Sequence, residues 1–160
     1  MKISSKTLSL LQSFAQISSN LLVKQGNKLA TRNVVNSIQA RAIVEETFPR
    51  QFAIYDLNQL LSLISVSQNP DVDFREKSLV IHSENGGEIE YFYADESLVT
   101  APNEQPPQME DVYVFKMTAT DINTIVKTAS IVSATMLNIV SDNGKVMLSI
   151  NDPKNSTSHS

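Results

Sequence analysis

One arrangement, an amphipathic helix followed by strands that tight turns separate, recurs three times along this chain. Each copy has apolar residues at i, i+3, i+4 and i+7, the spacing that places a single apolar stripe on a helix. The stripes are Thr7, Leu10, Leu11 and Phe14; Leu57, Leu60, Leu61 and Ile64; and Ile122, Ile125, Val126 and Ala129. A hairpin turn follows each stripe at Gly26, Glu76 and Gly144. A repeat on this scale constrains the fold more than any other feature.

Each copy is predicted to contain a strand, a helix, a strand, a tight turn and further strands. The expected helices span 4–17, 57–67 and about 118–132, with Asp56 and either Thr118 or Thr120 as N-caps. The expected strands span 20–24, 28–34, 37–45, 52–55, 72–74, 78–82, 88–93, 111–117, 135–140 and 145–150. Turns are predicted at 25–27, 75–77, 85–87 and 142–144. The pattern predicts an α+β fold of repeated βαβββ units, with antiparallel sheets and with helices on one face.

The segment 95–110 differs from the rest because it has no periodicity and contains Pro102, Pro106 and Pro107. Such composition is typical of an extended connector. We therefore predict a first domain at 1–94, a connector at 95–110 and an incomplete second domain at 111–160. The first domain contains two copies of the unit and the second only one. We interpret the chain as truncated, and the tail 152–160, which includes His159, carries nothing apolar.

Charge is distributed unevenly along the chain. Residues 1–44 carry six basic and no acidic side chains, residues 45–111 carry fourteen acidic and three basic ones, and the remainder carries a net charge of +1. This asymmetry predicts one positive and one negative surface. The polar faces of the three helices hold almost no acid beyond Asp56 and Asp121. Such faces suit a surface that meets a polyanion, although chance composition in a serine-rich chain explains them equally well.

Composition also excludes several classes of function. The chain has no cysteine, so it contains neither disulfides nor thiolate metal sites. No apolar run reaches the roughly 20 residues of a membrane span, and the N-terminus lacks a signal-peptide pattern. His82 stands without a second base or nucleophile, and the glycines fall in turns rather than in a phosphate-binding loop. We expect a soluble intracellular protein that is not an enzyme and needs no cofactor or metal.

Three segments carry a resemblance to a known family. They are Met1–Ser4 leading into Leu10-Leu11 and Phe14-Ala15, the motif Ala53-Ile54-Tyr55-Asp56-Leu57-Asn58, and the connector segment Val99–Asn103. In these the chain resembles the DNA sliding clamps of T-even-type bacteriophages, the DNA polymerase accessory proteins. The resemblance covers about the first 150 residues, and the family continues beyond them.

The resemblance implies a ring-shaped homotrimer, when full-length, that encircles duplex DNA of any sequence in the cytoplasm of an infected bacterium. Helices would line the lumen and sheets the outside. Such a processivity factor has no enzymatic activity; it tethers the replicative polymerase and is opened by an ATP-driven clamp loader. Lys2, Lys6 and Lys127 would then approach phosphates, with Lys24 and Lys28 as weaker candidates. Few and loose contacts suit a ring that slides.

Two further surfaces follow from the resemblance. A hydrophobic C-terminal peptide of the polymerase would dock beside the connector at Val99, Ala101 and Pro102, which on composition alone are equally well explained as plain linker. The subunit edge would be formed by Glu88, Ile89, Glu90, Tyr91, Phe92 and Tyr93. Because its partner strand would follow residue 160, we expect that this polypeptide alone does not close the ring.

An alternative remains open: a protein-interaction module that uses the same fold without DNA. It is favoured by the low positive charge of the helices, since only Lys127 lies within the third one.

Overall fold

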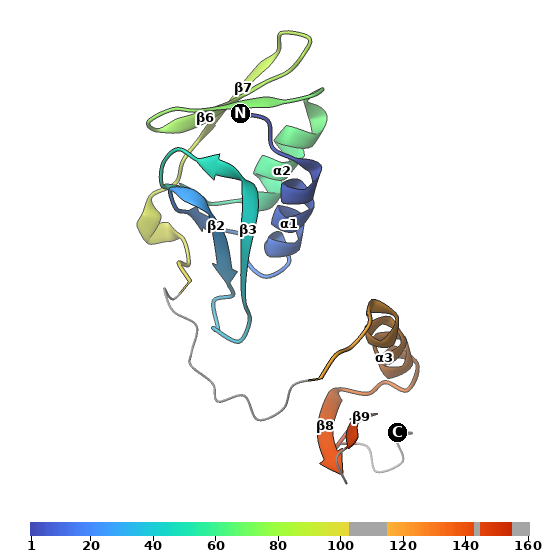
Figure 1. Ribbon diagram of the computed structural model, residues 1–160. Coiled ribbons are helices and arrows are strands. Elements are labelled where there is room, and N and C mark those ends of the chain that lie inside the picture. The colour runs from blue at the N-terminus through green and yellow to red at the C-terminus, as the bar shows by residue number, and fades with distance from the viewer. Residues whose placement is uncertain (103–114, 143–144, 155–160) are drawn as a thin grey trace. The chain divides into compact units, whose positions relative to one another are not determined.

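The computed structural model describes residues 1–102, 115–142 and 145–154 (Figure 1). The chain divides into two compact units, Met1–Pro106 and Pro107–Ser160. The division falls inside the predicted connector, and the connector's first residues belong to unit 1. Each unit is described by itself.

Unit 1 holds two helices and seven strands among its described residues. In chain order these are α1 (Ser5–Ala15), β1 (Leu21–Val23), β2 (Gly26–Arg32), β3 (Gln39–Phe48), β4 (Phe52–Ile54), α2 (Leu57–Val66), β5 (Asp71–Phe74), β6 (Ser78–His82) and β7 (Glu88–Phe92), followed by a 3-10 turn, η1 (Glu96–Leu98). All strand pairs are antiparallel: β1 with β4, β2 with β3, and β5–β6–β7 in that order. The predicted α+β class is confirmed, and Figure 1 shows α1 and α2 side by side.

Side-chain caps start both helices, at Ser4 and at the predicted cap Asp56. The Ser4 hydroxyl accepts a hydrogen bond from the Thr7 amide, and the Asp56 carboxylate accepts one from the Gln59 amide at 2.9 Å. These caps satisfy amide groups that have no partner within a helix. Each helix then buries one stripe, formed by Thr7, Leu11 and Phe14 in α1 and by Leu57, Leu60 and Ile64 in α2.

The two stripes meet the inner faces of the sheets in one hydrophobic core. Leu29, Leu79 and Ile81 in the sheets are at most 2% exposed. At one end of the core Phe52 stacks on Tyr93, with ring centroids 4.8 Å apart, and packs against further aromatic rings. Burial of this kind supplies most of the stability of a small domain. Unit 1 therefore has a complete core, built from two helix-and-strand halves.

The strand pairing around Gly26 differs from the prediction. We expected the turn 25–27 to join β1 and β2 as a hairpin, which is wrong. β1 pairs with β4 in the register Leu21↔Ile54, and β2 pairs with β3. Gly26 still turns the chain, with φ +110°, but it redirects the chain from one sheet to another.

The first and second copies of the repeat also differ in the order of their strands and helices. β4–α2–β5–β6–β7 has the full predicted sequence of elements, whereas the N-terminal copy begins directly at α1 because residues 1–4 form no strand. Residues 1–4 are nevertheless held in place by contacts of Met1 with β5. The Met1 ammonium group contacts Asp71, and the Met1 carbonyl accepts a hydrogen bond from the Val72 amide at 2.9 Å.

Unit 2 contains α3 (Ala119–Ile131), β8 (Met136–Asp142) and β9 (Lys145–Asn151). Thr118, one of the two predicted N-caps, caps α3 in a reciprocal arrangement with Asp121. β8 and β9 form the predicted antiparallel pair. Residues 115–117 are not in a strand, contrary to prediction; the rest of the predicted strand 111–117, the tip of the turn at 143–144 and the tail with His159 lie outside the described residues.

Candidate functional site

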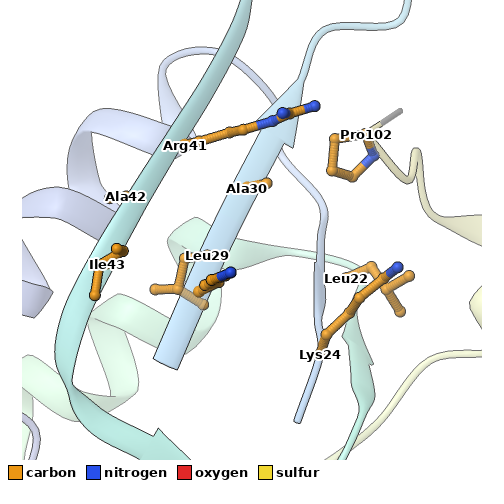
Figure 2. A pocket seen from close by; sticks show the side chains of 9 residues that line it. Leu22, Lys24, Leu29, Ala30, Arg41, Ala42, Ile43 and Pro102 are labelled. Carbon is orange, nitrogen blue, oxygen red and sulfur yellow. The ribbon is translucent and has the colours of Figure 1, made fainter. Parts of the chain in front are cut away.

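A groove of about 540 Å³ opens on the outer face of β1, β2 and β3 (Figure 2). Its walls combine small and aliphatic side chains with three cations. The lining residues are Leu22, Lys24, Lys28, Leu29, Ala30, Arg41, Ala42, Ile43 and Pro102. No carboxylate is among them.

Strand alternation explains why the groove faces away from the helices. Along β2, Leu29 belongs to the core that the helices cover and Thr31 is buried on the same side, so Lys28 and Ala30 point to the opposite face. The register places Lys28 opposite Ile43 and Ala30 opposite Arg41. The sheet thus presents alternating charged and apolar side chains on its outer surface.

The start of the predicted connector is held against this sheet. The Arg32 guanidinium donates to the Ala101 carbonyl at 2.7 Å, and the Asn20 side chain accepts from the Thr100 amide at 2.8 Å. Of the three predicted groove residues, Pro102 lines the groove, while Val99 and Ala101 precede it along the same segment. Arg41 was not predicted, although its alternation with Ile43 in a strand is the signal that places both on the outer face.

A groove with an apolar floor and a basic rim suits one kind of ligand. The small side chain of Ala30 leaves room for the ligand's anchor, and Lys24, Lys28 and Arg41 attract a carboxylate. A short peptide that carries apolar residues and ends in a carboxylate has both features.

The outward faces of α1 and α2 form a second candidate surface, which we call the helix face. Its exposed residues are Ser5, Lys6, Ser9, Gln12, Ser13, Gln16, Asn58, Gln59, Ser62, Ser65 and Val66. None of these is acidic, in a chain whose net charge is −4. The helix face can therefore approach a polyanion without carboxylate repulsion.

The five predicted lysines do not gather on the helix face. Lys24 and Lys28 share the outer groove. Lys6 lies on α1, 3.7 Å from the Glu45 carboxylate, with both side chains exposed, and the Lys2 ammonium group donates to the Asn69 side chain at 3.1 Å. Lys127 lies on α3 in unit 2.

The predicted subunit edge is the last strand of its sheet. β7 pairs with β6, and in the described part of the chain no strand lies on its other side along 88–92. Tyr91 points into the core and is 8% exposed, so that burial raises the pKa of its hydroxyl, whereas Phe92 is 68% exposed. Burial likewise raises the pKa of Tyr93 to about 12.

The described residues hold neither a metal-binding cluster nor a membrane-spanning helix. The His82 imidazole lies 3.1 Å from the Glu88 carboxylate, across neighbouring strands, and the register places Asp71 opposite His82 on the strand at its other side. Residues 1–102, 115–142 and 145–154 contain no group of three or more histidine, aspartate or glutamate side chains arranged to hold a metal. Within the same ranges, no helix is long and apolar enough to cross a membrane.

Unit 1 is thus an α+β assembly with an acid-free helix face on one side and a basic, partly apolar groove on the other. No protein-family model matches the chain. It is 27% identical over 164 residues to the sliding clamp of Vibrio phage KVP40, an alignment that covers 99% of this chain and 74% of that protein. It is 27% identical to the sliding clamp of Escherichia phage RB69 and 28% identical to that of Enterobacteria phage T4, each covering 92% of this chain and 65% of the relative.

The predicted resemblance is confirmed: over nearly its whole length the chain is similar to phage sliding clamps. It spans about two thirds to three quarters of the length of these relatives. Among solved structures, PCNA from Thermococcus kodakaraensis overlaps 96% of this chain and 71% of its own chain, with a TM-score of 0.46 and 11% sequence identity.

Proposed function

We propose that this protein is a DNA sliding clamp, a non-enzymatic processivity factor that encircles duplex DNA and tethers a replicative DNA polymerase. The observation that carries the proposal is the similarity to three phage proteins named sliding clamps, over 92–99% of this chain. In this proposal the full-length protein forms a homotrimer in the cytoplasm of an infected bacterium, and an ATP-driven clamp loader opens it.

The helix face supports a sliding contact with DNA. Apart from Lys6 and Val66, its side chains are neutral and polar, so that it offers the phosphate backbone few strong ion pairs. Affinity for duplex DNA depends mainly on such pairs, which are weakened by salt. A surface with few of them keeps a protein near DNA without fixing its position. Lys2, Lys6 and Lys127 are the proposed phosphate contacts.

Encirclement of DNA can be tested through topology. The full-length protein is loaded onto nicked circular DNA by the clamp loader of the same source with ATP, and the DNA-bound fraction is isolated. We expect the protein to stay on circles and to leave when a restriction enzyme linearises them. Equal retention on circular and linear DNA would show ordinary binding, and no retention on either would favour the non-DNA interaction module.

Charge reversal identifies the residues that face DNA. We expect the double variant Lys6→Glu, Lys127→Glu to lose retention on circular DNA and to abolish stimulation of the cognate polymerase. Lys77→Glu, on the turn between β5 and β6, changes the net charge without touching a helix and is the control. An unaffected double variant would contradict a helix-lined DNA channel.

The outer groove is proposed as the docking site for the polymerase's C-terminal peptide. Its support is the combination of an apolar floor and basic rim with Pro102 at its border. Ala30→Trp fills the groove from its outer face, and we expect it to weaken binding of the labelled peptide at least tenfold. Val35→Trp, at an exposed hairpin tip outside the groove, is the matched control and should bind normally.

The edge strand β7 is proposed as one side of the subunit interface, through backbone pairing with a strand of the next subunit. Its support is its terminal place in the sheet. The non-DNA module is the alternative, and it is favoured by the position of Lys24 and Lys28 on the outer groove rather than the helix face.

A further inference from the structure

Two side chains of unit 1 hold the backbone of the connector where it reaches the outer groove. Residues 99–102 belong to no strand, so a sheet ladder does not fix their position. The side-chain oxygen of Asn20 accepts a hydrogen bond from the Thr100 amide at 2.8 Å. The Arg32 guanidinium donates one to the Ala101 carbonyl at 2.7 Å. We call these two contacts the connector hydrogen bonds.

Asn20 and Arg32 lie beside the groove without lining it. Leu22, whose two neighbours in β1 are buried, lines the groove, and Asn20 stands two residues before it. On β2, Arg32 stands two residues after the lining residue Ala30, on the same outer face. Both side chains therefore reach the connector from the face on which the groove opens.

The residue that follows the connector hydrogen bonds forms a wall of the groove. Pro102 comes directly after Ala101 and lines the groove, and Figure 2 shows it on the side away from Ile43. Because a proline ring fixes its own φ near about −65°, the place of the Pro102 ring follows from the place of the Ala101 backbone. Two residues outside the lining thus determine where this wall stands.

We propose that Asn20 and Arg32 are positioning residues of the outer groove, which hold the connector so that Pro102 is in place before a peptide binds. The inference rests on the proposed docking function of the groove. A groove whose wall is in place for only part of the time has an apparent affinity reduced by that fraction. A wall already in place also spares the peptide the entropic cost of ordering the connector.

The alternative for Arg32 is a purely electrostatic role, since cations at the rim attract a carboxylate. Asn20 separates the two explanations because it carries no charge. Asn20→Leu keeps the approximate size of the side chain and removes the acceptor, whereas Arg32→Met removes both the donor and a charge. Weaker peptide binding by Arg32→Met alone, with normal binding by Asn20→Leu, would show the electrostatic role and overturn the proposal.

The motion of the connector can be measured without any peptide. The chain has no cysteine, so Ala101→Cys supplies a single thiol, at an exposed position, for a nitroxide label. We expect restricted motion of the label in this variant and faster motion after Asn20→Leu or Arg32→Met is added. Gln68→Leu, just beyond α2, and Arg75→Met, in the turn between β5 and β6, are the matched controls. Equal motion of the label in all of these proteins would overturn the proposal.

Binding of the C-terminal peptide of the cognate polymerase, labelled with a fluorophore, measures the consequence for the groove. We expect Asn20→Leu to weaken binding about fivefold and Arg32→Met about tenfold, with the two controls unchanged. Normal binding by both variants despite a mobile connector would overturn this inference alone. Wild-type protein that does not bind the peptide would overturn the docking function, and this inference with it.

A pair of substitutions at Thr100 tests the hydrogen bond itself. Thr100→Pro removes the amide hydrogen that Asn20 accepts, whereas Thr100→Ala keeps it. Val99 already has the extended backbone that a residue before proline requires, with φ −114° and ψ 147°. We expect Thr100→Pro to weaken peptide binding as Asn20→Leu does, and Thr100→Ala to bind normally. Combining Thr100→Pro with Asn20→Leu should add nothing, because both remove the same bond; additive losses would overturn the assigned contact.

Discussion

A single carboxylate joins the start of α1 to the sheet. Glu46 lies on β3 and is 8% exposed, yet both of its oxygens are occupied. One accepts a hydrogen bond from the Ser4 amide at 2.5 Å, and the other accepts from the Thr7 hydroxyl at 2.6 Å. A buried charge is tolerated only with such partners. Glu46 thus acts as a cap supplied from a distant strand, which local sequence patterns do not reveal.

We expect Glu46→Gln to destabilise unit 1 by about 1–3 kcal/mol, because an amide nitrogen would face one of the two donors. Chemical denaturation at neutral pH measures the effect. Glu45→Gln is the neighbouring control. Glu45 is exposed and pairs only loosely with Lys6, so its loss should change the free energy of unfolding by about 0.5 kcal/mol or less. Equal effects of the two variants would contradict the cap.

The same carboxylate predicts a dependence of stability on pH. Burial raises the pKa of Glu46, but the hydrogen bonds from Thr7 and Ser4 outweigh burial and hold the pKa below its usual 4.5. A lowered pKa means that the stabilisation is fully present above 4.5 and is lost as the pH falls through the folded-state value. The stability difference between the wild type and Glu46→Gln should therefore shrink on acidification. A difference that stays constant down to pH values well below 4.5 would contradict the assignment.

At the level of elements, the sequence predicted helices better than strand partners. Caps and apolar stripes lie within a few residues of each other, so α1, α2 and α3 could be placed to within two residues at either end. The pairing of β1 with β4 joins Leu21 to Ile54, and nothing local marks that contact. The strand expected at 28–34 ran past the true end of β2 to Val34, whereas Asn33 and Asn36 form the turn between β2 and β3.

The cap of α3 provides a test at this scale. The Thr118 hydroxyl accepts from the Asp121 amide, and the Asp121 carboxylate accepts from the Thr118 amide and hydroxyl. These bonds lower the pKa of Asp121. We expect Thr118→Ala to destabilise α3 by about 1 kcal/mol and to speed amide exchange in its first turn. Thr120→Ala, the other N-cap that the sequence suggested, should have a much smaller effect, and equal effects would contradict the observed cap.

For the whole molecule, the sequence anticipated the kind of protein, whereas the faces on which the candidate residues lie come from the structure. The resemblance rested on linear motifs such as Ala53–Asn58, which can be recognised without a structure. Lys24 and Lys28 were expected to approach DNA because they are basic and flank a turn. Both line the outer groove in the structure. The face on which a strand residue such as Lys28 lies depends on register and on which side the helices cover.

The two units differ in how much apolar surface they bury, and we expect them to unfold separately. Unit 1 encloses Leu57 completely, whereas none of the described side chains of α3 is buried. Leu57→Ala should remove about 2–5 kcal/mol of stability from unit 1 and lower the upper of two thermal transitions. The lower transition, from unit 2, should not move. Val66→Ala, an exposed position on the same helix, is the control and should leave both transitions in place.

Calorimetry combined with amide exchange distinguishes the units, because the amides of α3 should exchange long before those of β6. A single transition that shifts as a whole would show instead that the two units stabilise each other.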